Sequence, residues 1–190
     1  MPAAPVTIGP VSASEPSARG TLIWVPVADA LDLVPDCVAA ALRHVPSAEV
    51  TRIDPELADT TAFCAAYGVA PAASANCVVV AGKRAGETRY AAVMVLATGR
   101  ADINGVIRRH LDVRKISFAA MDDAVARTGM EYGGITPIGL PSNWPILIDS
   151  AVLVAGDVVV GSGRRGSKLL VPAAELRQLP GAEVLDLAII

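Results

Sequence analysis

Short apolar runs separated by polar, glycine-containing segments dominate this chain and predict mostly β-structure. Runs typical of strands occupy residues 21–27, 50–53, 77–81, 90–97, 145–149, 152–154, 157–160, 168–171 and 183–187. Residues 82–86, between the third and fourth runs, are rich in glycine and charged side chains, so we expect a hairpin there.

Apolar residues at helical spacing predict five helices between the strands. They cover residues 32–44, a segment that is capped by Asp59 and ends at Gly68, a segment that begins at Asp102, residues 121–128, and a segment that begins at Pro172 and ends at Pro180. Strands outnumber helices and most connections are short. The predicted fold class is therefore α/β in the mixed α+β sense: a single domain whose curled mixed β-sheet approaches a barrel and is surrounded by helices.

The most informative motif is the segment 133–139, which reads Gly-Gly-Ile-Thr-Pro-Ile-Gly. A solvent loop would be more polar, and an ordinary strand would not tolerate so much glycine. Glycine permits unusual backbone angles and close approach by another group, while Pro137 fixes one φ angle. The segment predicts a rigid, partly buried turn whose N–H groups can hold a small polar ligand. The open alternative is a tight turn that holds no ligand.

Composition places the chain among globular proteins of one domain. Of its 190 residues, 53% are hydrophobic and 18% are charged. Residues 1–20 are rich in Pro, Ala and Ser, which predicts a disordered or extended tail ahead of a single domain at residues 21–190. No apolar run is long enough to span a bilayer, and the first residues lack the pattern of a signal peptide. We therefore expect a cytoplasmic protein with no membrane partner.

The charge distribution argues against one class of partner and leaves another open. A net charge of −3 argues against wrapping a long duplex, so we expect no DNA partner. The same charge is compatible with gripping one end of an RNA. Basic residues gather at 83–89, 108–115 and 164–168, and each group is either a solvated face or a contact for phosphates.

The reactive side chains indicate neither a metal site nor a bound cofactor. Cys37, Cys64 and Cys77 form no Cys-x-x-Cys pair, and buried free thiols are the favoured interpretation. His44 and His110 lie far in sequence from any cysteine or acidic cluster with ligand spacing. The sequence also has no nucleophile elbow, phosphate-binding loop or dinucleotide fingerprint.

Four segments in a fixed order carry a family resemblance. They are Val95-Leu96-Ala97-Thr98-Gly99, the glycine-rich segment with the following strand that ends in Asp149, Gly161-Ser162-Gly163, and the close from Leu170 to Leu176. In these motifs the chain resembles the YbaK-type aminoacyl-tRNA deacylases, which are relatives of the editing domain inserted in bacterial prolyl-tRNA synthetase. The resemblance is clearest over residues 50–190.

The resemblance implies an enzyme that hydrolyses the ester between a wrongly attached amino acid and the terminal adenosine of a tRNA. The implied partners are the acceptor end of an aminoacyl-tRNA and, as a second candidate, an aminoacyl-tRNA synthetase. A monomer and a homodimer are both compatible with the sequence. An aminoacyl ester is already activated, so a positioned water and donors aimed at the developing oxyanion suffice without a covalent nucleophile. A small rigid pocket would exclude the larger, correct amino acid.

Carrying the family's motifs over residue by residue gives two groups of candidate site residues. The candidates for catalysis are Asn76, Gly134 and Thr136. The candidates for substrate binding are Gly133, Ile135, Pro137, Thr98, Asp149, Ser162 and Gly163. Asp149 has an alternative role as a residue that caps a turn.

One position departs from the family pattern. Family members place a lysine near the start of the strand that begins here at Asn76, and asparagine carries no charge. Either another basic residue compensates, or the substrate differs, or the protein is a catalytically impaired module that binds a tRNA end or a nucleotide. If Asn76 serves the site, its side chain should face the turn at residues 133–137. Cys77 should then face away, and Val78 should share the face of Asn76.

Overall fold

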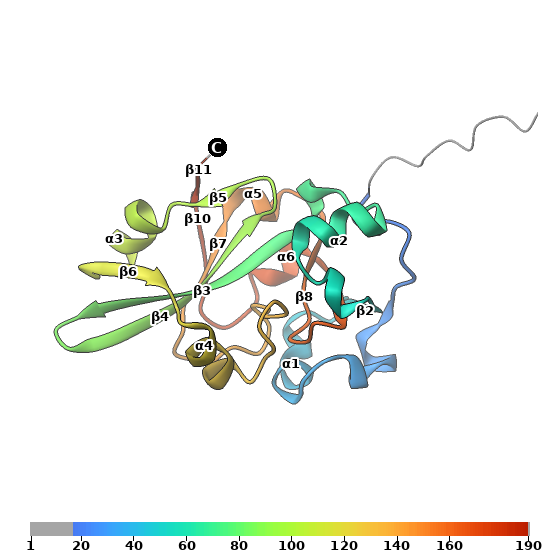
Figure 1. Ribbon diagram of the computed structural model, residues 1–190, viewed down its shortest axis with the longest axis horizontal. Helices are drawn as coiled ribbons and strands as arrows, with labels where there is room; N and C mark the ends of the chain where they lie inside the picture. The colour runs from blue at the N-terminus through green and yellow to red at the C-terminus, as the bar shows by residue number, and fades with distance from the viewer. Residues whose placement is uncertain (1–16, 190) are drawn as a thin grey trace, which may run out of the picture.

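A five-stranded mixed sheet forms the centre of the computed structural model, which describes residues 17–189 (Figure 1). Its strand order is β10 (Ala182–Leu185), β7 (Ile146–Asp149), β4 (Glu87–Leu96), β3 (Ala75–Arg84) and β6 (Lys115–Phe118). The strands β3 and β4 form the predicted hairpin, with Ala85 and Gly86 at its turn. The strand β7 pairs in parallel with both β4 and β10, so the second half of the chain returns to this sheet.

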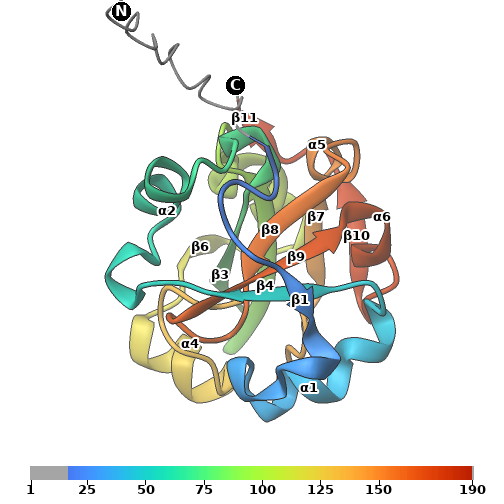
Figure 2. The same cartoon turned by 90° about the vertical axis from the view of Figure 1, so that its right-hand side faces the viewer.

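A second sheet of four antiparallel strands packs beside the first. Its order is β1 (Val25–Pro26), β2 (Glu49–Arg52), β9 (Ser167–Pro172) and β8 (Asp157–Gly161). Figure 2 shows this sheet in front, with α1 below it and α2 and α6 at its two sides. A small third sheet pairs β5 (Arg100–Ala101) with β11 (Ala188–Ile189). The expected single sheet that approaches a barrel is not confirmed, because the residues described form separate sheets that remain open.

Six short α-helices surround the sheets. They are α1 (Asp36–Ala41), α2 (Thr60–Tyr67), α3 (Arg108–His110), α4 (Met121–Thr128), α5 (Ser150–Leu153) and α6 (Ala173–Leu176). Tighter 3-10 turns lie at Val27–Asp29, Leu31–Leu33, Leu42–His44, Pro55–Leu57 and Pro71–Ala73, and a wider π-helical turn covers Ile103–Ile107. Within residues 17–189, no helix has the length and apolar character needed to cross a membrane.

The boundaries of α2 follow the sequence signals. Asp59 accepts hydrogen bonds from the N–H groups of Thr61 (3.0 Å) and Ala62 (3.3 Å), as an N-cap does. Gly68 ends the helix with a φ of 64°, a left-handed conformation that glycine adopts without strain. The predicted cap and terminator are both confirmed.

Three predicted elements differ from the structure. The expected helix at residues 32–44 is interrupted, because Pro35 lacks an N–H group and α1 starts only after it. The expected strand at 152–154 lies in and just after α5, which Asp149 starts by accepting the Ala151 N–H (3.0 Å). The expected strand at 21–27 is reduced to Val25–Pro26.

Most of the predicted tail, residues 1–16, lies outside the described residues. Its last residues are part of the fold, since Ser17 pairs with Val69 and its carbonyl accepts the Ala70 N–H (3.0 Å). The folded part therefore begins before residue 21.

The central sheet is buried on both faces. On one face, Met94 and Ile148 pack against Val158, Val160 and Leu169 of the second sheet. The opposite face is covered by the π-helical turn and the C-terminal residues, through a cluster of Val80, Val93, Ile107, Leu147 and Leu187. Coverage on both faces makes the sheet rigid. The candidate site lies at the edge of β3 that is not paired with a strand.

Candidate functional site

A cavity of about 760 Å³ lies along an open edge of β3. The strand β6 pairs with β3 only between Val80 and Lys83, so within residues 17–189 no strand pairs with the edge from Ala75 to Val79. The Val79 carbonyl accepts the Ala119 N–H (2.9 Å) on this side. Because the main-chain groups of a strand alternate in direction, the N–H and C=O of Cys77 face the same open edge.

Four parts of the chain that are distant in sequence form the cavity wall. They are the start of α2 (Ala58, Asp59, Thr60), the glycine-rich segment (Gly133, Ile135), the β8–β9 region (Gly161, Arg165, Lys168), and residues around β5 and β11 (Arg100, Asn104, Ile189). Two exposed aromatic side chains, Phe118 and Tyr132, also line it. The cavity is thus assembled only by the complete fold.

Close backbone packing holds the glycine-rich segment against the β8–β9 turn. The Gly163 N–H donates to the Gly134 carbonyl (2.7 Å), and the Glu131 N–H donates to the Gly163 carbonyl (2.9 Å). A Cβ at Gly134 would lie 2.6 Å from the Arg164 backbone, and a Cβ at Gly161 would lie 2.4 Å from the Gly134 oxygen. Glycine is required at both positions because two chain segments touch there.

Ser162 and Thr136 are buried behind this wall. The Ser162 hydroxyl lies 2.7 Å from the Ser167 hydroxyl, which donates to the Leu33 carbonyl (2.7 Å), so Ser162 fixes the shape of the β8–β9 turn. Thr136 is fully buried, and its hydroxyl has no hydrogen-bond partner in the part of the chain that the structure describes. Neither side chain lines the cavity.

Two main-chain donors of the glycine-rich segment remain available. The Gly134 N–H donates to the Glu131 carbonyl (2.9 Å), and the Thr136 N–H donates to the Met130 sulfur (3.5 Å). The N–H groups of Gly133 and Ile135 donate no hydrogen bond among residues 17–189, and both residues line the cavity. These two N–H groups are therefore unused within the described part of the chain.

Asn76 lines the cavity, and its carbonyl oxygen accepts a hydrogen bond from the Thr60 hydroxyl at the start of α2 (2.5 Å). Its partner therefore lies in a different element rather than in its own loop. Cys77 packs with the cluster of Met94, which includes Ile135 and Ile138, and Val78 packs with the cluster of Val93. The two side chains alternate as expected, but the expectation that Cys77 faces away from the glycine-rich turn is not confirmed, because Cys77 and not Val78 shares a cluster with that turn.

Of the predicted site residues, Asn76, Gly133 and Ile135 line the cavity. The others lie behind or away from it: Gly134, Thr136, Pro137, Ser162 and Gly163 are buried in the supporting wall, and Thr98 is exposed in the turn after β4. Asp149 is buried and caps α5, while its second oxygen accepts the N–H groups of Leu187 (2.7 Å) and Ala188 (2.8 Å). It holds β11 and thereby one wall of the cavity.

Lys168 was missed as a site residue. Its side chain is 6% exposed, its ammonium donates to the Ala58 carbonyl (2.8 Å), and it lies 5.2 Å from the centre of the Phe63 ring. Burial lowers the pKa of this lysine below its ordinary value. The sequence feature that could have identified it is a single lysine next to the apolar residues of a predicted strand.

Arg165 is a second missed residue at the cavity. Its guanidinium lies over Gly133, where a Cβ would be 2.6 Å from Nη1, and Gly133 has a φ of 82°. The guanidinium donates to the Pro55 carbonyl (2.9 Å), and the Arg165 N–H donates to a Glu131 carboxylate oxygen (2.6 Å). These contacts tie the glycine-rich segment to the loop before α2.

The thiols and acids near the cavity offer no nucleophile or metal site of the usual kind. Burial raises the pKa of the Cys77 thiol to about 12, and it also raises the pKa of Cys64. Both thiols are therefore neutral at physiological pH. Within residues 17–189, no group of three or more His, Cys, Asp or Glu side chains is placed to hold a metal ion.

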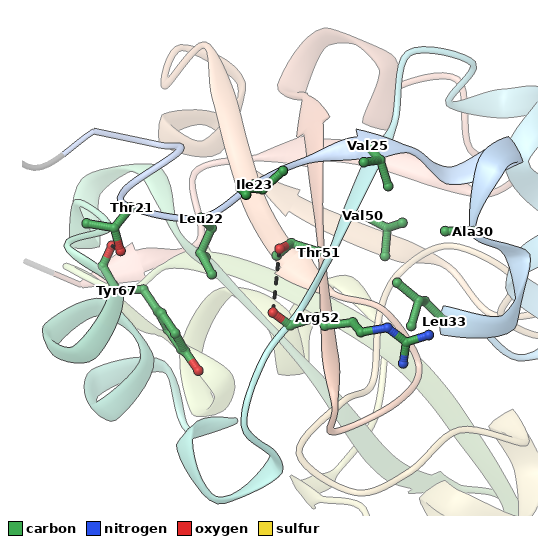
Figure 3. Close-up of a pocket in the computed structure, with 10 residues that line it drawn as sticks. All are labelled: Thr21, Leu22, Ile23, Val25, Ala30, Leu33, Val50, Thr51, Arg52 and Tyr67. Atoms are coloured by element: carbon green, nitrogen blue, oxygen red, sulfur yellow. Dashed lines mark hydrogen bonds between the residues drawn. The ribbon is translucent and has the colours of Figure 1, made fainter.

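The second cavity, about 530 Å³ in volume, lies beside β1 and is shown in Figure 3. Its wall is formed by residues such as Thr21, Ile23, Val50 and Tyr67, and Arg52 at its rim pairs with Asp32 (2.5 Å). None of the predicted site residues belongs to it. The larger cavity is therefore the candidate site.

Comparisons with known proteins identify the fold and the family. Two solved structures share the fold: a candidate trans-editing enzyme for prolyl tRNA synthetase (22% identity, TM-score 0.69, 81% of this chain and 96% of that chain) and the hypothetical protein APE2540 (22% identity, TM-score 0.70, 81% and 100%). The sequence profile of the aminoacyl-tRNA editing domain matches residues 54–179, which include most of the cavity wall. The chain belongs to the aminoacyl-tRNA editing domain family.

Proposed function

We propose that the protein is a trans-editing deacylase that hydrolyses the ester of a mischarged tRNA with a positioned water. Family membership supports the class of substrate, and the cavity supports the class of reaction. Its wall contains two unused N–H donors, at Gly133 and Ile135, and no activated thiol or metal cluster is needed for an ester that is already reactive.

The observation that carries the proposal is the pair of aromatic rings at the cavity. Phe118 is 61% exposed and Tyr132 is 57% exposed, and both line it. The chain has only seven Phe, Trp and Tyr residues, so exposing two at one opening is costly unless they serve binding. Exposed aromatic faces stack on unpaired nucleobases, and the terminal adenine of a tRNA is such a base.

A basic end beside the cavity is suited to the acceptor stem that follows this adenine. The stretch from 83 to 115 contains eight of the 16 basic residues but only three of the 19 acidic ones. Apart from Arg100 in β5, these basic residues lie at the tip of the β3–β4 hairpin, in α3 and at the start of β6, which lie together in Figure 1. Lys83 and Lys115 are direct cross-strand partners, and both are exposed. Two like charges placed opposite each other favour a bound polyanion.

The size of the cavity provides a means of selection. Its floor at Gly161 is main chain that packs against the buried Gly134 behind it, so it cannot retreat from a larger group. A small side chain on the substrate would fit between this floor and β3, and a larger one would prevent the ester from reaching the N–H donors. This arrangement rejects the larger amino acid by exclusion.

A panel of mischarged tRNAs tests the proposal. Purified protein should release a small amino acid from at least one of them faster than buffer alone, and the Phe118→Ala, Tyr132→Ala double variant should lose most of this rate. The alternative of a non-catalytic binding module is motivated by Asn76, whose oxygen is already used by Thr60. Tight binding of the acceptor end without release of any amino acid would favour that alternative.

A further inference from the structure

Lys168 is a buried charge without a counter-ion. It takes part in no ion pair among residues 17–189, and its single hydrogen-bond acceptor there is the Ala58 carbonyl. An ammonium has three donors, and burying one without a partner carboxylate is unfavourable. Asp59, which lines the same cavity, attracts this ammonium but lies beyond ion-pair distance, so Lys168 keeps donors for a negative charge that a ligand brings.

The position of Lys168 places it at the centre of the cavity wall. Its ammonium is bound to Ala58 and the Asn76 side chain is bound to Thr60, on either side of Asp59. Lys168 and Asn76 therefore converge on the same start of α2 from two different sheets. In the β8–β9 register Lys168 is the direct partner of Gly161, which contacts the Gly134 carbonyl. The ammonium thus lies between the start of β3 and the glycine-rich segment.

We infer that Lys168 is the catalytic cation of this cavity, whose ammonium donates to the carbonyl oxygen of the aminoacyl ester as negative charge develops there. The inference rests on the proposed function and names the residue that stabilises its transition state. Asn76 leaves the start of β3 without a charge, and Lys168 brings one into the same cavity from β9. Hydrogen bonds to a charged group are roughly twice as strong as neutral ones. The ammonium would therefore stabilise the oxyanion more strongly than either of the two neutral N–H donors.

The step balances without any cofactor. The oxygen of a water forms a bond to the carbonyl carbon, and the electron pair of the C=O bond moves onto the oxygen that Lys168 contacts. One water proton passes to solvent. When the pair returns, the bond to the adenosine oxygen breaks, and that oxygen takes a proton. The products are the free amino acid and the tRNA, and the lysine keeps its own protons throughout.

Replacing Lys168 with methionine tests the inference. Methionine matches the length of the lysine stem and suits the contact with Phe63, so the fold should be kept, as thermal unfolding would verify. We expect kcat for the tRNA that the unaltered protein hydrolyses to fall about 100-fold while KM stays nearly constant, as for the loss of an oxyanion donor. Arg177→Met, at an exposed site that lines neither cavity, is the control and should leave kcat unchanged.

Two further variants make the result specific to charge. Lys168→Arg should keep much of the activity and should lose the decline at alkaline pH that deprotonation of Lys168 imposes, after subtraction of spontaneous hydrolysis. Adding Asn76→Lys to Lys168→Met returns a cation to the same cavity and should recover part of the lost kcat.

The outcomes separate this inference from the proposed function. If the unaltered protein hydrolyses no mischarged tRNA, both are overturned. If it is active and Lys168→Met retains kcat, only the role of Lys168 is overturned. A rise in KM with kcat unchanged would also overturn it, because the lysine would then hold a phosphate of the bound tRNA and not the oxyanion.

Discussion

The glycine-rich side of the cavity and its basic side are built in opposite ways. On the first side, segments distant in sequence touch main chain to main chain, so that even a Cβ at Gly134 or Gly161 has no room. On the second side, a two-stranded hairpin extends from the sheet, and its tip carries exposed lysines and arginines (Figure 1). The two sides meet at β3, which contributes Asn76 to the cavity and Lys83 to the hairpin tip.

This difference separates two tasks that ester hydrolysis on an RNA requires. Groups that stabilise a transition state must be fixed in place, and tightly packed backbone provides that. Groups that attract a phosphate backbone act over several ångströms and tolerate movement. Changes on the glycine-rich side should therefore affect kcat and stability, whereas changes on the basic side should affect affinity alone.

The largest effect is expected from Gly134→Ala. The added carbon meets the Arg164 backbone, so the glycine-rich segment must shift, with a cost of about 1–3 kcal/mol in the free energy of unfolding. A shift of about 1 Å at the donors reduces kcat by about 100-fold. Gly166→Ala, in the β8–β9 turn that packs against this segment, is the control, because its Cβ would meet only Pro55 at 3.7 Å. Equal melting temperatures and rates for the two variants would contradict the packing argument.

A smaller effect is expected from Phe118→Ala at the opening. Loss of one stacking surface for a base costs about 1–3 kcal/mol of binding free energy. We expect weaker binding of a short RNA that ends in an unpaired adenosine, measured by fluorescence anisotropy, with an unchanged melting temperature because the ring is exposed. The exposed Met121 is a control residue, since it does not line the cavity. Unchanged affinity in Phe118→Ala would remove the proposed stacking contact.

A third effect, on salt dependence, is expected from the double variant Lys83→Gln, Lys115→Gln. If each lysine meets one phosphate, the slope of log Kd against log salt concentration should decrease by about 1.5 for the pair. The fold should be kept or slightly stabilised, because two like charges no longer face each other. The kcat at saturating tRNA should not change. A slope equal to that of the unaltered protein would place the acceptor stem elsewhere.

The smallest effect concerns stability and pH. The folded-state pKa of Lys168 is lowered by burial, so between that value and the ordinary value of 10.5 the unfolded chain binds more protons than the folded one. Within this window the contribution of Lys168 to the free energy of unfolding becomes more favourable to the folded state as the pH rises. Below the window Lys168 destabilises the fold, so Lys168→Met should be at least as stable as the unaltered protein at neutral pH, and this advantage should shrink in alkali. Urea unfolding of both proteins at several pH values measures this difference.

The sequence was informative where local chemistry decides the structure. The α2 caps, the β3–β4 hairpin and the buried glycine-rich turn follow from residue types that act within a few positions of one another. The polar strands β5 and β6 were missed because strands such as Arg100–Ala101 lack an apolar pattern and exist only through their partners. The barrel was expected because strand content does not reveal which edges pair.

The candidate site was harder to predict for a related reason. Sequence motifs identified Gly133, Ile135 and Asn76, but they could not distinguish a glycine that faces a ligand from one that allows two chain segments to touch, as at Gly134. Lys168 and Phe118 belong to no motif. They reach the cavity only because β9 and β6 are placed beside α2 and β3 by pairing over long sequence distances.

The bonds from Asp149 to the N–H groups of Leu187 and Ala188 affect the order in which the protein matures. Ile189 lines the cavity, and β11, to which it belongs, is the last element of the described chain to leave the ribosome. Until then the Asp149 carboxylate lacks two of its hydrogen-bond donors, and β5 lacks its partner strand. A nascent chain would therefore fold its two larger sheets before the cavity is complete. Under the proposed function, a mischarged tRNA would find a finished site only after residue 189 has been synthesised.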